Sequence, residues 1–224
     1  MLVVAEICSL GSRALLISDH AVSSARLARR IEALGLAGLC EIVPAATTTT
    51  ITFETTEWRD AARGLLITRL AEQYDAGAQD STTPDSDRLV ELRCRFDGPD
   101  LAEVGDATGL GIDGVVEMLT TARLQVAFCG FSPGFAYLDG LPEELHLPRR
   151  STPRARVEAG SVAIASHYAA VYPAASPGGW HLLGSTEAAV WRIDREPPAL
   201  LRPGTVVRLI DADDEPRPRS QWVR

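Results

Sequence analysis

The chain has 224 residues, of which 46% are hydrophobic and 23% charged, as in an ordinary globular protein of one large or two small domains. Its formal net charge of −8 argues against nucleic acid as a partner, because phosphate binding needs a basic face. The four cysteines form no C-x-x-C pair and no apolar run approaches a membrane span of ~20 residues, so we expect reduced thiols in a soluble cytoplasmic protein without metal or membrane contact.

The first 80 residues alternate strand-like and helix-like patterns. One helix is expected to begin at Ser23 or Ser24, which are N-cap residue types, and to end at Gly35, with Leu27 and Ile31 on its apolar stripe. A second helical period runs from Trp58 to about Tyr74. The predicted strands are Leu2–Cys8, Arg13–Ile17, Glu41–Val43 and Thr47–Phe53. The order predicts a small antiparallel sheet with helices on one face.

The segment from Asp75 to Asp87 is small, acidic and rich in turn-forming residues, with no periodicity. This composition is typical of a linker. We therefore predict an N-terminal α+β domain over residues 1–80, a linker over 81–88 and a second domain over 89–224.

The second domain begins with the predicted strand Leu89–Phe96, two short helices and the strand Leu124–Cys129. The helices are expected over Leu101–Thr108 and Asp113–Ala122. Short β-like runs separated by glycine and proline follow, namely Gly160–Ala165, Ala169–Tyr172, Gly179–Leu183, Ala189–Ile193 and Gly204–Ile210. Closely spaced short strands of this kind predict a closed barrel or a sandwich.

The stretch Phe128–Leu141 contains three glycines, one proline and four aromatic residues, whereas the whole chain is only 6% aromatic. Glycine and proline shape the backbone, and the aromatic side chains supply rigid apolar area. Two interpretations are open on composition: a partly exposed working surface, or a loop whose aromatic rings only pack against the barrel.

Two further segments and one histidine are candidates for ligand contact. Four arginines lie within Pro148–Arg156, and arginine binds carboxylate or phosphate in a bidentate manner, although this loop could instead pair with nearby acids. In Ser176–Trp180 a Gly-Gly pair would let backbone N–H groups approach a ligand, or would only form a tight turn. His167 could act as an acid or base near neutral pH, but a lone histidine is more often structural.

Familiar catalytic signatures are missing from the sequence. It contains no phosphate-binding P-loop, no H-E-x-x-H and no G-x-S-x-G elbow. The run Gly130–Gly134 comes near the elbow, but Pro133 removes the N–H that an oxyanion hole would use after Ser132. No self-contained catalytic set is identified, so a site completed by a partner is expected.

The ordered motifs resemble one known family. These are Phe128-x-Gly-Phe-x-Pro-Gly-Phe-x-Tyr-Leu-x-Gly-Leu141, then Leu147-Pro-Arg-Arg-x-Thr-Pro-Arg154, Val157-x-Ala-Gly-Ser-Val162, Tyr172-Pro and Ser176-Pro-Gly-Gly-Trp180. Together they resemble the family of the 5-oxoprolinase B subunit (PxpB), also called KipI-like or allophanate hydrolase subunit 1. The resemblance covers about residues 90–210.

The resemblance implies a fold, partners and a cofactor. The expected fold is α+β: an N-terminal α/β sandwich-like domain and a C-terminal cyclophilin-like β-barrel. The expected partners are the C subunit of 5-oxoprolinase, which has a related barrel, and the A subunit, and the complex would open 5-oxoproline to glutamate with ATP and Mg²⁺. Alternatives within the same family are a KipI-like inhibitor of a histidine kinase and a carboxyltransferase subunit of the urea carboxylase or allophanate hydrolase type.

From the motifs we expect one composite cleft or subunit interface, with the catalytic residues unassigned. The residues expected to bind substrate or another anion are Arg149, Arg150, Arg154, Gly178, Gly179 and Trp180. Those expected to line the cleft or the interface are Phe131, Pro133, Gly134, Phe135, Tyr137, His167, Tyr172 and Pro177. The chain departs from the family pattern at Leu119, Leu124 and Ala169-Ala170, where the family commonly has His, Tyr and Thr-Gly, so polar contacts near Tyr172 are in doubt.

Overall fold

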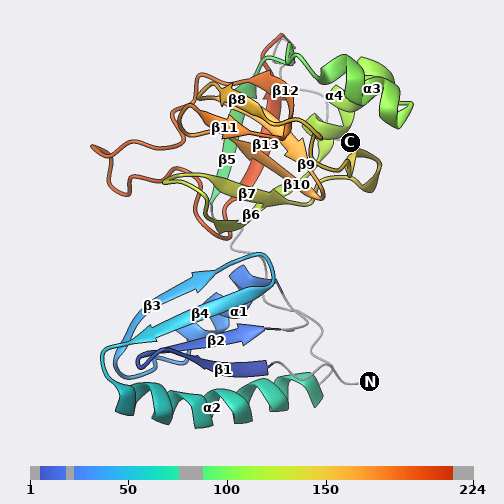
Figure 1. Ribbon diagram of the computed structural model, residues 1–224. Helices are drawn as coiled ribbons and strands as arrows, with labels where there is room; N and C mark the ends of the chain where they lie inside the picture. The colour runs from blue at the N-terminus through green and yellow to red at the C-terminus, as the bar shows by residue number, and fades with distance from the viewer. Residues whose placement is uncertain (1–5, 19–22, 76–87, 214–224) are drawn as a thin grey trace, which may run out of the picture. The chain divides into compact units, whose positions relative to one another are not determined.

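The structure, a computed structural model, describes residues 6–18, 23–75 and 88–213 (Figure 1). The chain divides into two compact units. The first takes in the described residues up to Arg88 together with 125–138 and 201–206, and the second contains 89–124, 139–200 and the described residues from Val207 onward. The predicted linker lies outside the described residues except for Arg88, so the predicted domain boundaries stay a prediction.

The N-terminal sheet has four antiparallel strands in the order β1-β2-β4-β3. Their bounds are β1 Glu6–Leu10, β2 Ala14–Ser18, β3 Leu39–Pro44 and β4 Thr48–Phe53. Buried and partly exposed residues alternate along β2 and β4, so that Leu15, Ile17, Ile51 and Phe53 share one face. One face of the sheet is therefore the core face.

Two helices cover this core face. Helix α1 (Ser24–Glu32) and helix α2 (Thr56–Asp75) contribute Leu27, Ile31, Ala62 and Leu66 to the same buried cluster as the β2 and β4 side chains. Ser23 occupies the N-cap position of α1 as predicted, but its side chain makes no capping hydrogen bond. The predicted α+β domain with helices on one face is confirmed.

The larger sheet has seven strands in the order β12-β9-β10-β7-β6-β13-β5. Its strands, with a separate two-stranded pair of β8 and β11, are β5 Leu89–Cys94, β6 Leu124–Cys129, β7 Ala136–Asp139, β8 Arg154–Val157, β9 Ser161–Ala165, β10 Tyr168–Val171, β11 Ser176–Gly178, β12 His181–Ser185 and β13 Val206–Asp211. The short strands curl into a barrel-like sheet (Figure 1). Such curling is how small antiparallel sheets limit their exposed edges.

The two edge strands of this sheet meet beyond the end of β5. Arg95 and Ser185 exchange two backbone hydrogen bonds of 2.8 Å, and the Gly98 N–H donates to the Leu183 carbonyl at 3.1 Å. Glycine is required here, because a Cβ on Gly98 or on Gly184 would collide with the facing backbone. The barrel is nearly closed along this seam, which confirms the predicted barrel.

Helices α3 (Leu101–Thr108) and α4 (Gly111–Thr121) follow the seam, and a 3₁₀ turn, η1, spans Glu143–Leu145. Gly109 ends α3 in the left-handed region with φ 73°, directly after the predicted helix end at Thr108. No helix of the described chain combines the length and the apolar character needed to cross a membrane.

One predicted strand is wrong. Residues Ala189–Ile193 form no strand, and only an isolated bridge joins Trp191 to Ala199. This segment folds back on itself instead of joining a sheet: the Leu200 N–H donates to the Val190 carbonyl and the Arg192 N–H to the Pro198 carbonyl. The Arg195 guanidinium donates to the carbonyls of Ala189, Val190 and Pro198 and thereby holds the loop together. Strands β7, β8 and β11 were not predicted from the sequence.

Candidate functional site

A buried carboxylate, that of Asp100, holds the arginine segment, which is Pro148–Arg156. Asp100 stands at the N-cap of α3 with its side chain 2% exposed. Its Oδ1 accepts hydrogen bonds from Arg150 Nη1 at 2.9 Å and Arg154 Nη2 at 2.6 Å, and its Oδ2 accepts one from the Leu182 N–H at 2.7 Å. Bonds to a charged acceptor are shorter and stronger than neutral ones. Asp100 thus joins α3, the arginine segment and β12.

The local charges balance. Arg150 Nη1 also donates to Glu103 Oε2 at 2.7 Å, so two arginines face two carboxylates. Burial raises the pKa of Asp100, but the hydrogen bonds from Arg154 and the Leu182 N–H, with the charges of both arginines, outweigh it and lower the pKa overall. The Glu103 hydrogen bond and the Asp100 charge raise the pKa of Arg150. Both guanidiniums are therefore neutralised within the chain.

Arg149, also predicted to bind an anion, differs from its two neighbours. Its side chain is exposed and makes no hydrogen bond or ion pair to any residue that the structure describes. Among the three predicted arginines it is the one whose positive charge is not already matched by a carboxylate. It is therefore the arginine of the three that an incoming anion could meet without displacing an internal partner.

The structure brings the arginine segment and the Gly-Gly-Trp segment together. The Arg150 N–H donates to the Gly179 carbonyl at 2.8 Å, and Arg154 pairs with Gly178 in the β8–β11 ladder. The ring of His181 contacts the Pro148 carbonyl through Nε2 at 2.9 Å. Two of the three predicted loops thus run side by side within one compact unit. The composite cleft of three loops stays a prediction.

The aromatic residues of this region lie in the core. Trp180 is 5% exposed and Tyr172 is 2% exposed. Tyr172 fills the space that a side chain at position 178 would need, because a Cβ on Gly178 would collide with the Tyr172 hydroxyl. Pro177 is exposed, and Gly179 is partly buried. Gly178 therefore lets the backbone pack closely on Tyr172, whereas a Cβ on Gly179 would make only ordinary contacts with Arg150 and Pro153.

The predicted motif after β6 forms a tight, hydrogen-bonded turn. The Gly130 N–H donates to the Phe135 carbonyl at 3.0 Å, and the Phe135 N–H donates to the Ser132 carbonyl at 3.0 Å. The turn holds Phe131 at a φ of 67°, a conformation that costs a non-glycine residue about 1 kcal/mol or more, and leaves its ring 66% exposed. Gly134 is buried and has φ 79°, which suits glycine.

The aromatic rings of this motif form a ladder behind Phe131. Phe131 meets Phe135 edge-on at 5.4 Å, Phe135 lies 5.1 Å from Tyr137, and Tyr137 stacks on Phe128 at 4.3 Å. Phe135 is 2% exposed, whereas Pro133 is exposed. Phe135 therefore packs into the core, whereas the Phe131 ring is exposed, and a working surface at this loop stays a prediction.

His167 lies at the tip of the β9–β10 hairpin, where it forms the two-residue turn with Ser166. Ser166 has a φ of 53°, and its N–H donates to the Leu147 carbonyl at 2.6 Å. The exposed His167 ring lies 3.9 Å from Tyr168 and 6.1 Å from His146. His167 is therefore accessible but stands on a different turn from the arginine segment.

Sequence reasoning missed Asp100 and Glu103. The available signal was an aspartate directly before a predicted helix, which indicates an N-cap. In the structure the Asp100 side chain makes no capping bond, because its oxygens accept from residues 50, 54 and 82 positions away. A local pattern does not reveal partners at that separation.

Comparison with known proteins gives consistent matches. The family model "Carboxyltransferase domain, subdomain C and D" matches residues 6–201. The 5-oxoprolinase B subunit of Escherichia coli O157:H7 is 46% identical over 126 residues, which are 55% of this chain and 58% of that protein. The protein of the same name from Bacillus subtilis strain 168 is 32% identical over 197 residues, which are 80% of this chain and 78% of that protein.

Solved structures agree on the fold. The crystal structure of TTHA0988 is similar to this chain with a TM-score of 0.69 and 34% identity. The similar region covers 92% of this chain and 41% of the TTHA0988 chain. The structure of the K. lactis urea amidolyase is similar over 92% of this chain and 15% of the amidolyase chain, with a TM-score of 0.65. At 18% identity this similarity concerns the fold alone. The match thus spans less than two thirds of the E. coli relative and less than half of TTHA0988.

Proposed function

Because the chain belongs to the carboxyltransferase subdomain C and D family, together with the 5-oxoprolinase B subunit, we propose that it is the B subunit of an ATP-dependent 5-oxoprolinase. The complex would convert 5-oxo-L-proline, ATP and water to L-glutamate, ADP and phosphate, acting with the A and C subunits. The observation that carries the proposal is the 32% identity to the B. subtilis protein over 80% of this chain.

The cofactor, ATP with Mg²⁺, needs free cationic groups and metal ligands, which the paired arginines and their carboxylates do not supply. The ring amide of 5-oxoproline is stable, so its opening is coupled to ATP. The guanidiniums of Arg150 and Arg154 do not fit ATP phosphates as they stand, because Asp100 and Glu103 already neutralise them. Among the described residues, no three His, Cys, Asp or Glu side chains form a metal cluster that Mg²⁺ could use. In this proposal the ion-pair group of Asp100, Glu103, Arg150 and Arg154 therefore takes no part in ATP binding.

Within this proposal Arg149 contacts an anion, either the substrate carboxylate or a phosphate oxygen. It is exposed and carries a positive charge that no described carboxylate neutralises. Arg150 and Arg154 are positioning residues, because the Asp100 carboxylate fixes the segment on which Arg149 stands. Phe131 would contact the C subunit, since its ring is 66% exposed and packs edge-on against Phe135. Phe131 stands on the motif turn, which is Gly130–Phe135.

The test is reconstitution of the purified chain with the A and C subunits from the same organism. We expect glutamate formation from 5-oxoproline that depends on ATP and on all three proteins. Replacing Arg149 by alanine should lower kcat/KM for 5-oxoproline by at least tenfold. The matched control is Arg156→Ala, which should leave the rate unchanged. Arg156 lies in the same segment and, among the residues that the structure describes, pairs only with the exposed Glu158.

The other family activities are outcomes that would replace the proposal. If the three proteins are inactive on 5-oxoproline but carboxylate urea with a biotin carboxyl carrier, a carboxyltransferase role takes its place. If the chain alone binds a histidine-kinase dimerisation domain and suppresses autophosphorylation, a kinase-inhibitor role takes its place. Full activity of the chain alone on 5-oxoproline would also overturn the proposal.

A further inference from the structure

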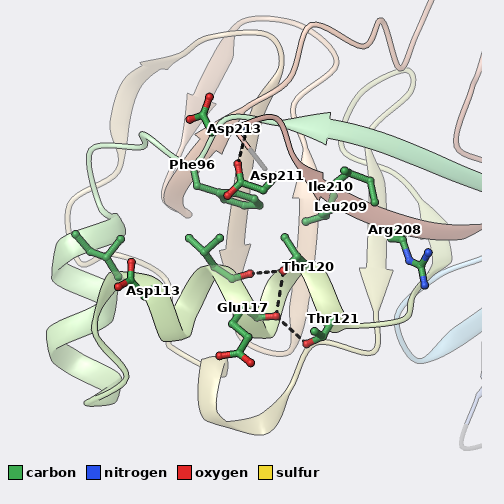
Figure 2. Close-up of a pocket in the computed structure, with 12 residues that line it drawn as sticks. Phe96, Asp113, Glu117, Thr120, Thr121, Arg208, Leu209, Ile210, Asp211 and Asp213 are labelled. Atoms are coloured by element: carbon green, nitrogen blue, oxygen red, sulfur yellow. Dashed lines mark hydrogen bonds between the residues drawn. The ribbon is translucent and has the colours of Figure 1, made fainter. Parts of the chain in front are cut away.

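A groove of about 940 Å³ lies between helix α4 and the end of strand β13 (Figure 2), and none of its lining residues belongs to the arginine segment. One wall is the face of α4 that carries Asp113, Val116 and Glu117, and the other is the end of β13 with Ile210 and Asp211. All of these residues belong to one compact unit. The groove is thus a feature of a single unit.

The two threonine hydroxyls of α4 that line the groove donate within the helix. Thr120 Oγ1 donates to the Val116 carbonyl at 2.8 Å, and Thr121 Oγ1 donates to the Glu117 carbonyl at 2.7 Å. Figure 2 shows both bonds running along the helix instead of into the groove. A hydroxyl whose hydrogen is used in this way offers only its oxygen lone pairs to a ligand.

The opposite wall combines two aspartates with one arginine. The Asp213 N–H donates to Asp211 Oδ1 at 3.0 Å. Arg208 Nη1 lies 3.6 Å from Glu91 Oε1, so its charge is shared with a carboxylate outside the groove lining. This wall therefore offers the carboxylate oxygens of Asp211 and Asp213 as acceptors, and Arg208 as the one side chain with N–H donors. Since carboxylates outnumber arginine in the lining, an occupant that brings hydrogen-bond donors is favoured.

Charge and apolar area define the occupant further. Four carboxylates line the groove, those of Asp113, Glu117, Asp211 and Asp213, against one arginine. Apolar side chains stand between them, and Ile112 at the rim is 48% exposed. A chain segment that combines positive charge with apolar side chains would satisfy both features, since opposite potentials across an interface favour association.

We propose that the α4–β13 groove is a docking site for a cationic amphipathic segment of a partner protein. Helix α4 has 11 residues, so the groove wall is about 16 Å long at ~1.5 Å per residue. An extended segment rises ~3.3 Å per residue, so about five residues of the partner lie along it. This site is independent of the proposed 5-oxoprolinase activity, because it uses neither the arginine segment nor the motif turn.

The test uses the full chain and an eight-residue peptide, acetylated and amidated, in which lysine alternates with leucine. We expect saturable binding that shifts the amide signals of α4 and β13 and weakens as salt rises from about 50 to about 300 mM. The double substitution Asp113→Asn/Glu117→Gln should weaken binding about fivefold, which is the loss of two exposed ion pairs. The control Asp106→Asn/Glu187→Gln removes two exposed carboxylates outside the groove lining and should change nothing.

Four outcomes would overturn the proposal. They are absence of binding, equal binding of a peptide with glutamate in place of lysine, no effect of the groove substitutions, and shifts located elsewhere. Two other occupants are also distinguished. If binding occurs only after Arg217, Arg219 and Arg224 are replaced by glutamine, the chain's own C-terminal residues occupy the groove. If the wild type self-associates and the groove variant does not, a second copy is the occupant.

Discussion

Replacing Asp100 by alanine removes one acceptor that serves two arginines and a backbone amide. The Leu182 N–H is buried, and leaving such a donor without an acceptor costs about 1–3 kcal/mol. Breaking a wholly buried ion pair costs about 3–5 kcal/mol, but Arg150 and Arg154 are 25% and 27% exposed, so water compensates part of their loss. We expect the free energy of unfolding of this unit to fall by about 3 kcal/mol.

Two measurements check this magnitude. Urea unfolding of the full chain gives the change in stability, and hydrogen exchange of the Leu182 amide reports the lost acceptor directly. Asp100→Asn keeps an oxygen for the Leu182 N–H but loses the charge, so it should cost less, about 1.5 kcal/mol. Arg156→Ala breaks an exposed ion pair in the same segment and should stay within about 0.5 kcal/mol of the wild type. If Asp100→Ala costs no more than Arg156→Ala, Asp100 does not organise the segment.

Three further predictions concern packing, thiols and pH. Gly98→Ala should lower the free energy of unfolding by about 2–3 kcal/mol, because the new Cβ would collide with backbone atoms at the barrel seam. The control Gly64→Ala, in the middle of α2 where the Cβ meets nothing, should raise the free energy of unfolding by about 0.5–1 kcal/mol. Equal effects of the two substitutions in urea unfolding would contradict the close packing at the seam. Burial raises the pKa of the buried Cys94 to about 12 and that of the partly buried Cys129 to about 11. A thiol reagent at pH 8 should therefore modify both only after denaturation, and rapid reaction of either thiol in the native chain would contradict this. The folded-state pKa of Asp100 is lowered, so its contribution is present above about pH 4 and is lost as pH falls through the folded value. The stability difference between the wild type and Asp100→Asn should therefore shrink in acid, and a difference independent of pH would show that the charge is not the cause.

The elements with a clear local pattern are those that the sequence predicts well. The stripe of Leu27 and Ile31 in α1 and the β-branched run of β4 are local signals, and strand β6 has the predicted bounds Leu124–Cys129. Strand β11 was missed because Ser176-Pro-Gly178 contains the two residues least common in strands. Its pairing with β8 arises from tertiary contact that no local pattern indicates.

The candidate site shows the same division. The sequence placed arginines and glycines in two segments, and the structure pairs these segments through Arg150 and Gly179. What it could not indicate is that Asp100 neutralises the arginines, since their separation in the chain is 50 residues or more. Nor could it separate Phe135, which is buried, from Phe131, which is exposed, because the difference lies in a turn with positive φ.

The most direct test of the proposed function is glutamate production from 5-oxoproline by the purified chain mixed with the A and C subunits. The account predicts ATP-dependent glutamate formation with all three proteins present and none when this chain is left out. Glutamate formation at the same rate by the A and C subunits without this chain would contradict it, as would its absence from a complex that assembles completely.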